Sequence, residues 1–183
     1  MRLVILDRDG VINYDSDDFI KSPEEWVPIP GSLEAIARLH RAGYRVVIAT
    51  NQSGVGRGLL DVDTLERIHE RMLDAVQKEG GKIDGIFFCP HKPEDCCLCR
   101  KPKPGLLQQI AERMKVNLNR VYAVGDSERD IVAARRVSAS PILVRTGKGN
   151  ETLEQSNELT GVPVFDSLAA FTDALLSDQV TTG

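Results

Sequence analysis

Two aspartates, Asp7 and Asp9, are the residues of this chain whose type and spacing point most directly to chemistry. They follow the apolar residues 3–6, which are typical of a short strand buried on both faces. Because side chains alternate along a strand, both carboxylates can face the same side beyond its end, and Gly10 permits a tight turn there. Two acidic groups held close together repel each other, so the pair indicates a shared cation or a shared proton. An acidic turn that caps a strand is the alternative for so short a motif.

The rest of the sequence alternates between strand and helix patterns. Strands are expected at residues 3–6, 45–49, 83–89, 121–124 and 141–144, with a weaker one near Val164. Helices are expected to begin at the N-caps Ser32 and Asp63, and to cover residues 107–114, 129–136 and 167–176. This alternation predicts an α/β fold in which a mainly parallel, Rossmann-like sheet carries helices on both faces.

The composition limits the classes of protein to which the chain can belong. Its 183 residues, 27% of them charged, suit one domain over residues 1–183 with a flexible tail from about residue 178. A net charge of −4 without a basic block argues against a nucleic-acid partner. Only four apolar residues precede Asp7, too few for a signal peptide or a membrane span. All four cysteines fall within residues 89–99, which gives no disulfide framework for the whole chain, so we expect a protein of the reducing cytoplasm. We also expect it to be a monomer.

Polar side chains follow several of the predicted strands. In chain order they are Asp7 and Asp9, then Thr50, Asn51, Gln52 and Ser53, then Arg100 and Lys101, and finally Asp126 and Asp130. Ligands of parallel sheets bind beyond the carboxyl ends of the strands. Any one of these residues could cap a strand or a helix, but capping does not explain why all of them converge on one edge.

In order and spacing these residues resemble the four motifs of the haloacid dehalogenase-like phosphatases. The motifs are Asp7-x-Asp9-Gly10, Thr50-Asn51, Lys101, and Gly125-Asp126 with Asp130. The likeness runs from residue 3 to about residue 146, and a cysteine/histidine loop before the motif lysine points to the branch acting on heptose bisphosphate and histidinol phosphate. Short connections after the first and second motifs leave no room for a large cap domain. The resemblance therefore implies a capless fold of this superfamily with a zinc-binding loop.

The resemblance also implies a role for each motif residue. Asp7 would be the nucleophile that forms an aspartyl phosphate, and Asp9 would protonate the leaving oxygen and then deprotonate water. Magnesium would be held by Asp7, the backbone carbonyl of Asp9 and Asp126, because this hard cation prefers oxygen ligands. Thr50 and Lys101 would bind the transferring phosphoryl oxygens.

The expected substrate is a phosphorylated sugar, a heptose 1,7-bisphosphate that loses its 7-phosphate during the synthesis of nucleotide-activated heptose. Residues 9–13, 50–54 and 100–105 favour this substrate by resemblance, whereas the segment 15–19 departs from the heptose branch. Ser53 offers a neutral hydroxyl to sugar oxygens, and Arg100 can bind a second phosphate. The residues expected to contact substrate are Asp15, Ser16, Asp17, Asp18, Thr50, Asn51, Gln52, Ser53, Arg100 and Lys101.

Two other functions are alternatives: a histidinol-phosphate phosphatase, and a catalytically idle protein whose zinc loop mediates interactions. The second is disfavoured because the whole catalytic set is present. Asp130 is expected to support the metal site rather than bind metal. The segment 145–148 could contact a substrate phosphate or be an ordinary solvated loop.

A second cluster is formed by Cys89, His91, Cys97 and Cys99. Three thiolates and one imidazole on a loop too short for its own core match a closed tetrahedral zinc site, and a disulfide is the alternative. The spacing before the motif lysine makes Cys97, rather than Cys96, the ligand by resemblance. Because four protein ligands leave no position for water, this zinc would be structural and would fix the loop that carries Arg100.

Overall fold

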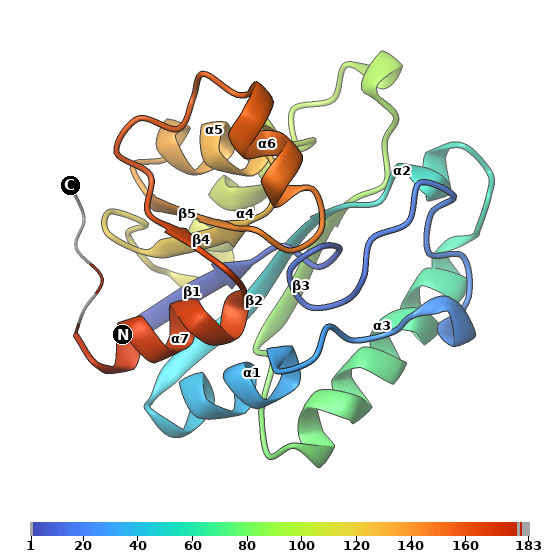
Figure 1. Ribbon diagram of the computed structural model, residues 1–183. Coiled ribbons are helices and arrows are strands. Elements are labelled where there is room, and N and C mark those ends of the chain that lie inside the picture. Colours follow the sequence, from blue (N-terminus) through green and yellow to red (C-terminus); the bar gives the residue numbers. More distant parts are fainter. Residues whose placement is uncertain (1, 179, 181–183) are drawn as a thin grey trace.

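A computed structural model describes residues 2–178 and 180 of the chain. Within them, six strands form one sheet in the order β3-β2-β1-β4-β5-β6, and all neighbouring strands are parallel (Figure 1). The strands are β1 (Arg2–Leu6), β2 (Tyr44–Asn51), β3 (Gly85–Cys89), β4 (Tyr122–Gly125), β5 (Ser140–Val144) and β6 (Val164–Phe165). The helices are α1 (Ser32–Arg41), α2 (Ser53–Gly56), α3 (Val62–Lys78), α4 (Gly105–Met114), α5 (Glu128–Arg136), α6 (Gly149–Gln155) and α7 (Leu168–Leu176), with the 3-10 turns η1 (Pro23–Glu25) and η2 (Pro93–Asp95). The predicted parallel α/β architecture is confirmed.

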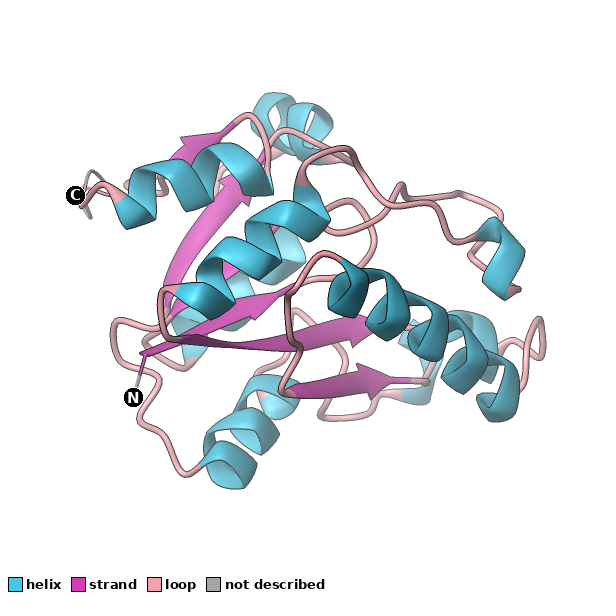
Figure 2. Cartoon of the chain, turned by 90° about the horizontal axis from the view of Figure 1, so that it is seen from below, coloured by secondary structure: helices cyan, strands magenta, loops and turns pink. Residues whose placement is uncertain are grey.

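Helices cover both faces of the sheet (Figure 2). Along β1, Val4 and Leu6 pack in a cluster with α1, α3 and α7, whereas Leu3 and Ile5 pack on the other face with α4 and α5. This division follows from the alternation of side chains along a strand. Burying each of these side chains contributes roughly 1.5–3 kcal/mol, so the central strand is firmly held.

Two helices are capped by other residues than predicted. Ser32 is not the N-cap of α1: Gly31 is, with a φ of 85°, and the Ser32 hydroxyl donates instead to the carbonyl of Val11 at 2.9 Å. Likewise, α3 is capped by Asp61, whose carboxylate accepts the Thr64 N–H at 2.7 Å. The prediction of Asp63 as the N-cap was therefore wrong. The short α2 and α6 were missed because neither is long enough to show an apolar stripe.

The end of β2 lies two residues beyond its predicted position. Thr50 and Asn51 belong to the strand because they pair with Phe88 and Cys89 of β3. This pairing fixes two polar side chains at the carboxyl edge of the sheet, next to the strand end that delivers Asp7.

The connections around the carboxyl edge are short. Residues 7–31 join β1 to α1, and the segment between β2 and β3 holds α2 and α3. Both connections are fully described, and neither contains an inserted domain, as expected for a capless fold. None of the helices in residues 2–178 could reach across a membrane as an apolar span. The predicted tail from about residue 178 lies mostly outside the described residues.

Candidate active site and cysteine/histidine cluster

A cavity of about 210 Å³ lies beyond the carboxyl ends of the strands. Its lining residues are Asp7, Asp9, Asp15, Ser16, Asp17, Phe19, Ile20, Thr50, Asn51, Gln52, Ser53, Arg57, Arg100, Arg129 and Lys148. The strand order reverses around β1, with β2 on one side and β4 on the other, and such a switch point is where open parallel sheets bind ligands. Of the residues predicted to contact substrate, Asp18 and Lys101 do not line the cavity. Phe19 and Ile20 line it although neither was among the predicted contacts.

The ammonium group of Lys101 is buried beside Asp7. Its Nζ lies 3.1 Å from Oδ1 of Asp7 and 2.6 Å from Oδ1 of Asp130, and it donates to the carbonyl of Ala49 at 2.7 Å. The Asn51 side chain holds the Lys101 backbone, since it accepts the Lys101 N–H and donates to the Lys101 carbonyl, each at 3.0 Å. Burial lowers the pKa of Lys101, but the charges of Asp130 and Asp7 outweigh it and raise that pKa above its ordinary value. The lysine is therefore a fixed positive charge next to Asp7.

Three buried carboxylates, Asp7, Asp126 and Asp130, place oxygen atoms within 4.8 Å of one another. Asp130 is restrained on both oxygens, because Oδ1 accepts from Lys101 and Oδ2 accepts from the N–H and hydroxyl of Ser127 at 3.1 and 2.6 Å. These bonds also form the capping box that begins α5. Asp130 thus orients Lys101, and its support of the metal site stays a prediction.

The backbone approaches Asp126 closely at two glycines. A Cβ at Gly10 would lie 2.0 Å from Oδ2 of Asp126, and one at Gly147 would lie 2.2 Å from the same atom. The same oxygen accepts the Lys148 N–H at 2.8 Å, while the Thr146 hydroxyl donates to the Gly10 carbonyl at 2.6 Å. The segment after β5 therefore adjoins Asp126 and Gly10 through its backbone, although Arg145, Gly147 and Lys148 are exposed. Contact between residues 145–148 and a substrate phosphate stays a prediction.

The electrostatics of this carboxylate group suit a divalent cation. Burial, together with the charges of Asp130 and Asp7, raises the pKa of Asp126 to about 8. Burial also raises the pKa of Asp7 to about 6, although Lys101 opposes the shift. Ionised oxygens that are poorly solvated and repel one another are stabilised by a hard cation, so the residues present fit magnesium.

We expect the stabilisation of the protein by Mg²⁺ to increase as the pH rises from about 5 to about 8. In the folded protein without metal, the pKa values of Asp7 and Asp126 lie above the ordinary value of 3.8. Protonation of these two carboxyl groups therefore contributes fully to the stability of the fold at a pH below 3.8. It is lost as the pH passes through about 6 and about 8, where the carboxylates ionise and can bind metal. Thermal unfolding with and without Mg²⁺ across this range measures the effect. A Tm shift that is independent of pH, or that persists in Asp126→Asn, contradicts it.

Asp9 forms another part of the cavity wall. Its carboxylate accepts from Nδ2 of Asn13 and from Nε2 of Gln52, each at 2.8 Å, and Gln52 also bonds the Thr50 hydroxyl at 2.9 Å. Burial raises the pKa of Asp9, but the charge of Arg8 and these hydrogen bonds outweigh it, and the pKa lies below its ordinary value. A phosphate bound nearby, as a like charge, favours the protonated carboxyl.

Three further basic side chains line the cavity: Arg57 and Arg129, which were not predicted as substrate contacts, and Lys148 of the segment 145–148. Nζ of Lys148 lies 3.7 Å from Asp15 and 3.6 Å from Asp17, which links two expected substrate residues to the loop after β5. Arg129 has a buried Nε without a hydrogen-bond partner among the described residues. A possible sequence signal for Arg129 was its position directly before the motif residue Asp130. Together with Arg100, these groups make the cavity suitable for a highly anionic ligand.

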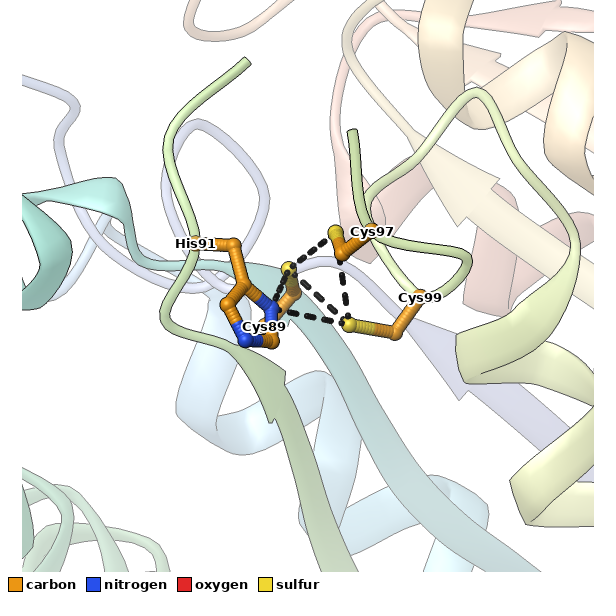
Figure 3. Close-up of side chains that lie close together, drawn as sticks. All are labelled: Cys89, His91, Cys97 and Cys99. Atoms are coloured by element: carbon orange, nitrogen blue, oxygen red, sulfur yellow. Dashed lines mark hydrogen bonds between the residues drawn. The ribbon is translucent and has the colours of Figure 1, made fainter. Parts of the chain in front are cut away.

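The cysteine/histidine cluster lies at the end of β3 (Figure 3). Sγ of Cys89 is 3.6 Å from that of Cys97 and 3.2 Å from that of Cys99, and the last two are 3.6 Å apart. Nδ1 of His91 is 3.3 Å from Sγ of Cys99 and 3.5 Å from Sγ of Cys89. A tetrahedral metal with bonds of about 2.3 Å to sulfur has its ligand atoms about 3.8 Å apart, close to this arrangement. All four cysteines are free thiols, so the alternative of a disulfide is wrong.

The cluster adjoins the segment that enters the active site. Cys96 lies outside the cluster, exposed and with a φ of 50°. The Arg100 N–H donates to Sγ of Cys97 at 3.4 Å, and its guanidinium donates to the carbonyl of His91 at 3.4 Å. Since Arg100 lines the cavity and Lys101 follows it, the loop positions both residues.

Comparisons with known proteins agree with this site. Residues 98–171 match a family model described as HAD-hydrolase-like. A D-glycero-β-D-manno-heptose-1,7-bisphosphate 7-phosphatase from Bordetella bronchiseptica is 53% identical over 178 residues, which are 97% of this chain and 99% of the relative. The protein of that name from Pseudomonas aeruginosa is 54% identical over 174 residues, 95% of this chain and 97% of the relative.

Solved structures show the same similarity. The D,D-heptose 1,7-bisphosphate phosphatase of B. bronchiseptica, complexed with magnesium and phosphate, has a TM-score of 0.95 at 53% identity and covers 97% of this chain and 99% of that one. The corresponding phosphatase from Burkholderia thailandensis has a TM-score of 0.77 at 46% identity, with the same coverage of 97% and 99%.

Proposed function

This chain belongs to the D-glycero-β-D-manno-heptose-1,7-bisphosphate 7-phosphatases, a family of haloacid dehalogenase-like hydrolases, and from that premise we propose that Asp7 removes the 7-phosphate of this sugar bisphosphate. The observation that carries the proposal is the buried contact between Asp7 and Lys101, 3.1 Å apart, in which Asp7 lines a cavity that also carries basic side chains. A carboxylate fixed beside a permanent positive charge can approach the phosphorus of an anionic ester.

The reaction proceeds in two steps. The Asp7 carboxylate attacks phosphorus, the bond between phosphorus and the C7 oxygen breaks, and that oxygen takes the proton of Asp9. Water then attacks the phosphorus of the aspartyl phosphate and gives a proton to the Asp9 carboxylate. The bond between phosphorus and the Asp7 oxygen breaks, so inorganic phosphate leaves and the Asp7 carboxylate is restored. Lys101 and Thr50 stabilise the phosphoryl oxygens during both steps. Magnesium, when bound by Asp7, Asp126 and the backbone carbonyl of Asp9, would offset the repulsion between carboxylate and phosphate.

A structural zinc ion is the second cofactor in this proposal. Cys89, His91, Cys97 and Cys99 would hold it, supported by the near-tetrahedral separation of their ligand atoms. None of the four cysteines forms a disulfide, which suits the reducing cytoplasm, and we place the protein there. We also propose that it is a monomer.

Substrate recognition is assigned to the rest of the cavity. The sugar hydroxyls lie against the Ser53 hydroxyl and the segment of Asp15, Ser16 and Asp17, and the 1-phosphate binds Arg100. Asp18 is left out of this assignment because it is exposed and does not line the cavity.

We expect kcat/KM for the heptose 1,7-bisphosphate to exceed that for histidinol phosphate by about 10²-fold or more. Histidinol phosphate carries a single phosphate and a cationic amine, so the basic groups around Arg100 would repel it and stay unpaired. Phosphate release from both compounds, measured on one preparation, tests the assignment. Equal or better turnover of histidinol phosphate would leave a phosphatase but remove the heptose substrate.

A further inference from the structure

Arg8, between the two catalytic aspartates in the chain, is a charged side chain with 0% exposure. Its guanidinium binds both oxygens of the Asp9 carboxylate: Nε donates to Oδ1 at 3.0 Å and Nη2 donates to Oδ2 at 3.1 Å. Two parallel bonds of this kind fix the plane of a carboxylate as well as its distance. The reaction outlined above gives Arg8 no role, although burying a guanidinium is costly.

The third nitrogen of the guanidinium contacts His69 of α3. Nη1 of Arg8 lies 3.2 Å from Nε2 of His69, and the imidazole is 6% exposed. A guanidinium can only donate, so Nε2 must accept and the ring must be neutral. Burial and the charge of Arg8 lower the pKa of His69 to about 3, in agreement with a neutral ring. The imidazole also packs against Phe88 of β3, with ring centroids 6.1 Å apart.

We infer that Arg8, held in place by neutral His69, is a positioning residue that orients the Asp9 carboxyl toward the leaving oxygen. The inference rests on the proposed function, since it assigns a support to the acid and base of that reaction. Arg8 donates two hydrogen bonds to the carboxylate, and Asn13 and Gln52 donate one each at 2.8 Å, so four hydrogen bonds restrain it. Only Arg8 contacts both of its oxygens through one rigid group. A misplacement of about 1 Å at a reacting group can cost about 10²-fold in rate.

The test compares two leaving groups in Arg8→Met. An alkoxide needs a proton from Asp9 to depart from phosphorus, whereas p-nitrophenolate departs as an anion. We therefore expect kcat/KM for the heptose bisphosphate to fall about 10²-fold and kcat/KM for p-nitrophenyl phosphate to fall less than about tenfold. The second step still needs Asp9 as a base, so p-nitrophenyl phosphate should give a burst of nitrophenolate equal to the enzyme concentration. A merely structural role for Arg8 would lower both kcat/KM values together.

Variants at His69 provide an independent test that leaves the guanidinium in place. His69→Leu removes the acceptor and should lower kcat/KM for the heptose bisphosphate about tenfold more than for p-nitrophenyl phosphate. His69→Gln keeps an acceptor and should restore most of the loss, while His40→Leu on the exposed side of α1 serves as the control. Equal losses for both substrates in Arg8→Met and His69→Leu would overturn the inference. Failure of the unmodified protein to hydrolyse the heptose bisphosphate would instead overturn the proposed function.

Discussion

The substitution Asp7→Asn is expected to lower kcat by about 10⁴-fold or more while the protein remains folded. An amide has no anionic oxygen with which to attack phosphorus. Its oxygen can still accept the Arg8 N–H that Asp7 binds at 2.8 Å, and Lys101 keeps its 2.6 Å contact with Asp130. The loss should therefore be chemical rather than structural. Phosphate release under saturating substrate measures it.

Asp7→Asn should also leave the thermal stability of the protein intact. The pKa of Asp7 is raised to about 6 by burial, so its ionised form is unfavourable in the folded protein without metal at neutral pH. Asp7→Asn removes that charge, and its Tm in the absence of Mg²⁺ should be no lower than that of the parent. Asp63→Asn, in the exposed first turn of α3, should leave kcat unchanged as a matched control. Substantial turnover by Asp7→Asn would exclude the covalent mechanism.

The sequence could predict the position of the site because parallel strands share one carboxyl edge. Asp7 and Asp126 follow β1 and β4, which are neighbours in the sheet, so their convergence needed only the alternation of strands and helices. The cysteine/histidine cluster was predictable for a similar reason, since Cys89 and Cys99 lie ten residues apart in a loop without a core of its own. The shared edge of the sheet was sufficient for the two aspartates, and local spacing was sufficient for the cluster.

Contacts between distant segments were not predictable in the same way. The bond between Arg8 and His69 joins residues 61 apart in the chain, and neither residue type signals the other. Ser32 shows the same limit, because its hydroxyl could cap a helix but finds the carbonyl of Val11 instead. Asp18 lies one position from residues that do line the cavity, yet the turn of residues 16–19 carries it to the surface. Propensity and spacing describe neighbours in sequence, whereas these contacts depend on how the elements pack.

The cysteine/histidine cluster is expected to bind one zinc ion per chain tightly enough to survive purification without added metal. The ligand atoms of Cys89, His91, Cys97 and Cys99 all lie within 4.8 Å of one another. Cys97→Ser should lose the ion, because a hydroxyl is a far weaker zinc ligand than a thiolate. Cys96→Ser, one residue away and outside the cluster, should keep it. Elemental analysis of the three proteins gives the zinc content directly, and a protein without zinc contradicts the prediction.

Loss of the zinc ion should act on the reaction through the loop rather than through chemistry at the metal. Arg100 is tied to the cluster by its N–H bond to Sγ of Cys97, so a loop without metal no longer holds Arg100 firmly and weakens the support of Lys101, the next residue. Because the 1-phosphate of the substrate is assigned to Arg100, Cys97→Ser should raise KM for the heptose bisphosphate and lower kcat. Asn51 still anchors the Lys101 backbone through two bonds of 3.0 Å, so some activity should remain. If Cys97→Ser lacks zinc yet keeps the parental kcat and KM, the loop does not depend on the metal. If Cys96→Ser loses zinc as well, Cys96 belongs to the site and the assignment of four ligands is wrong.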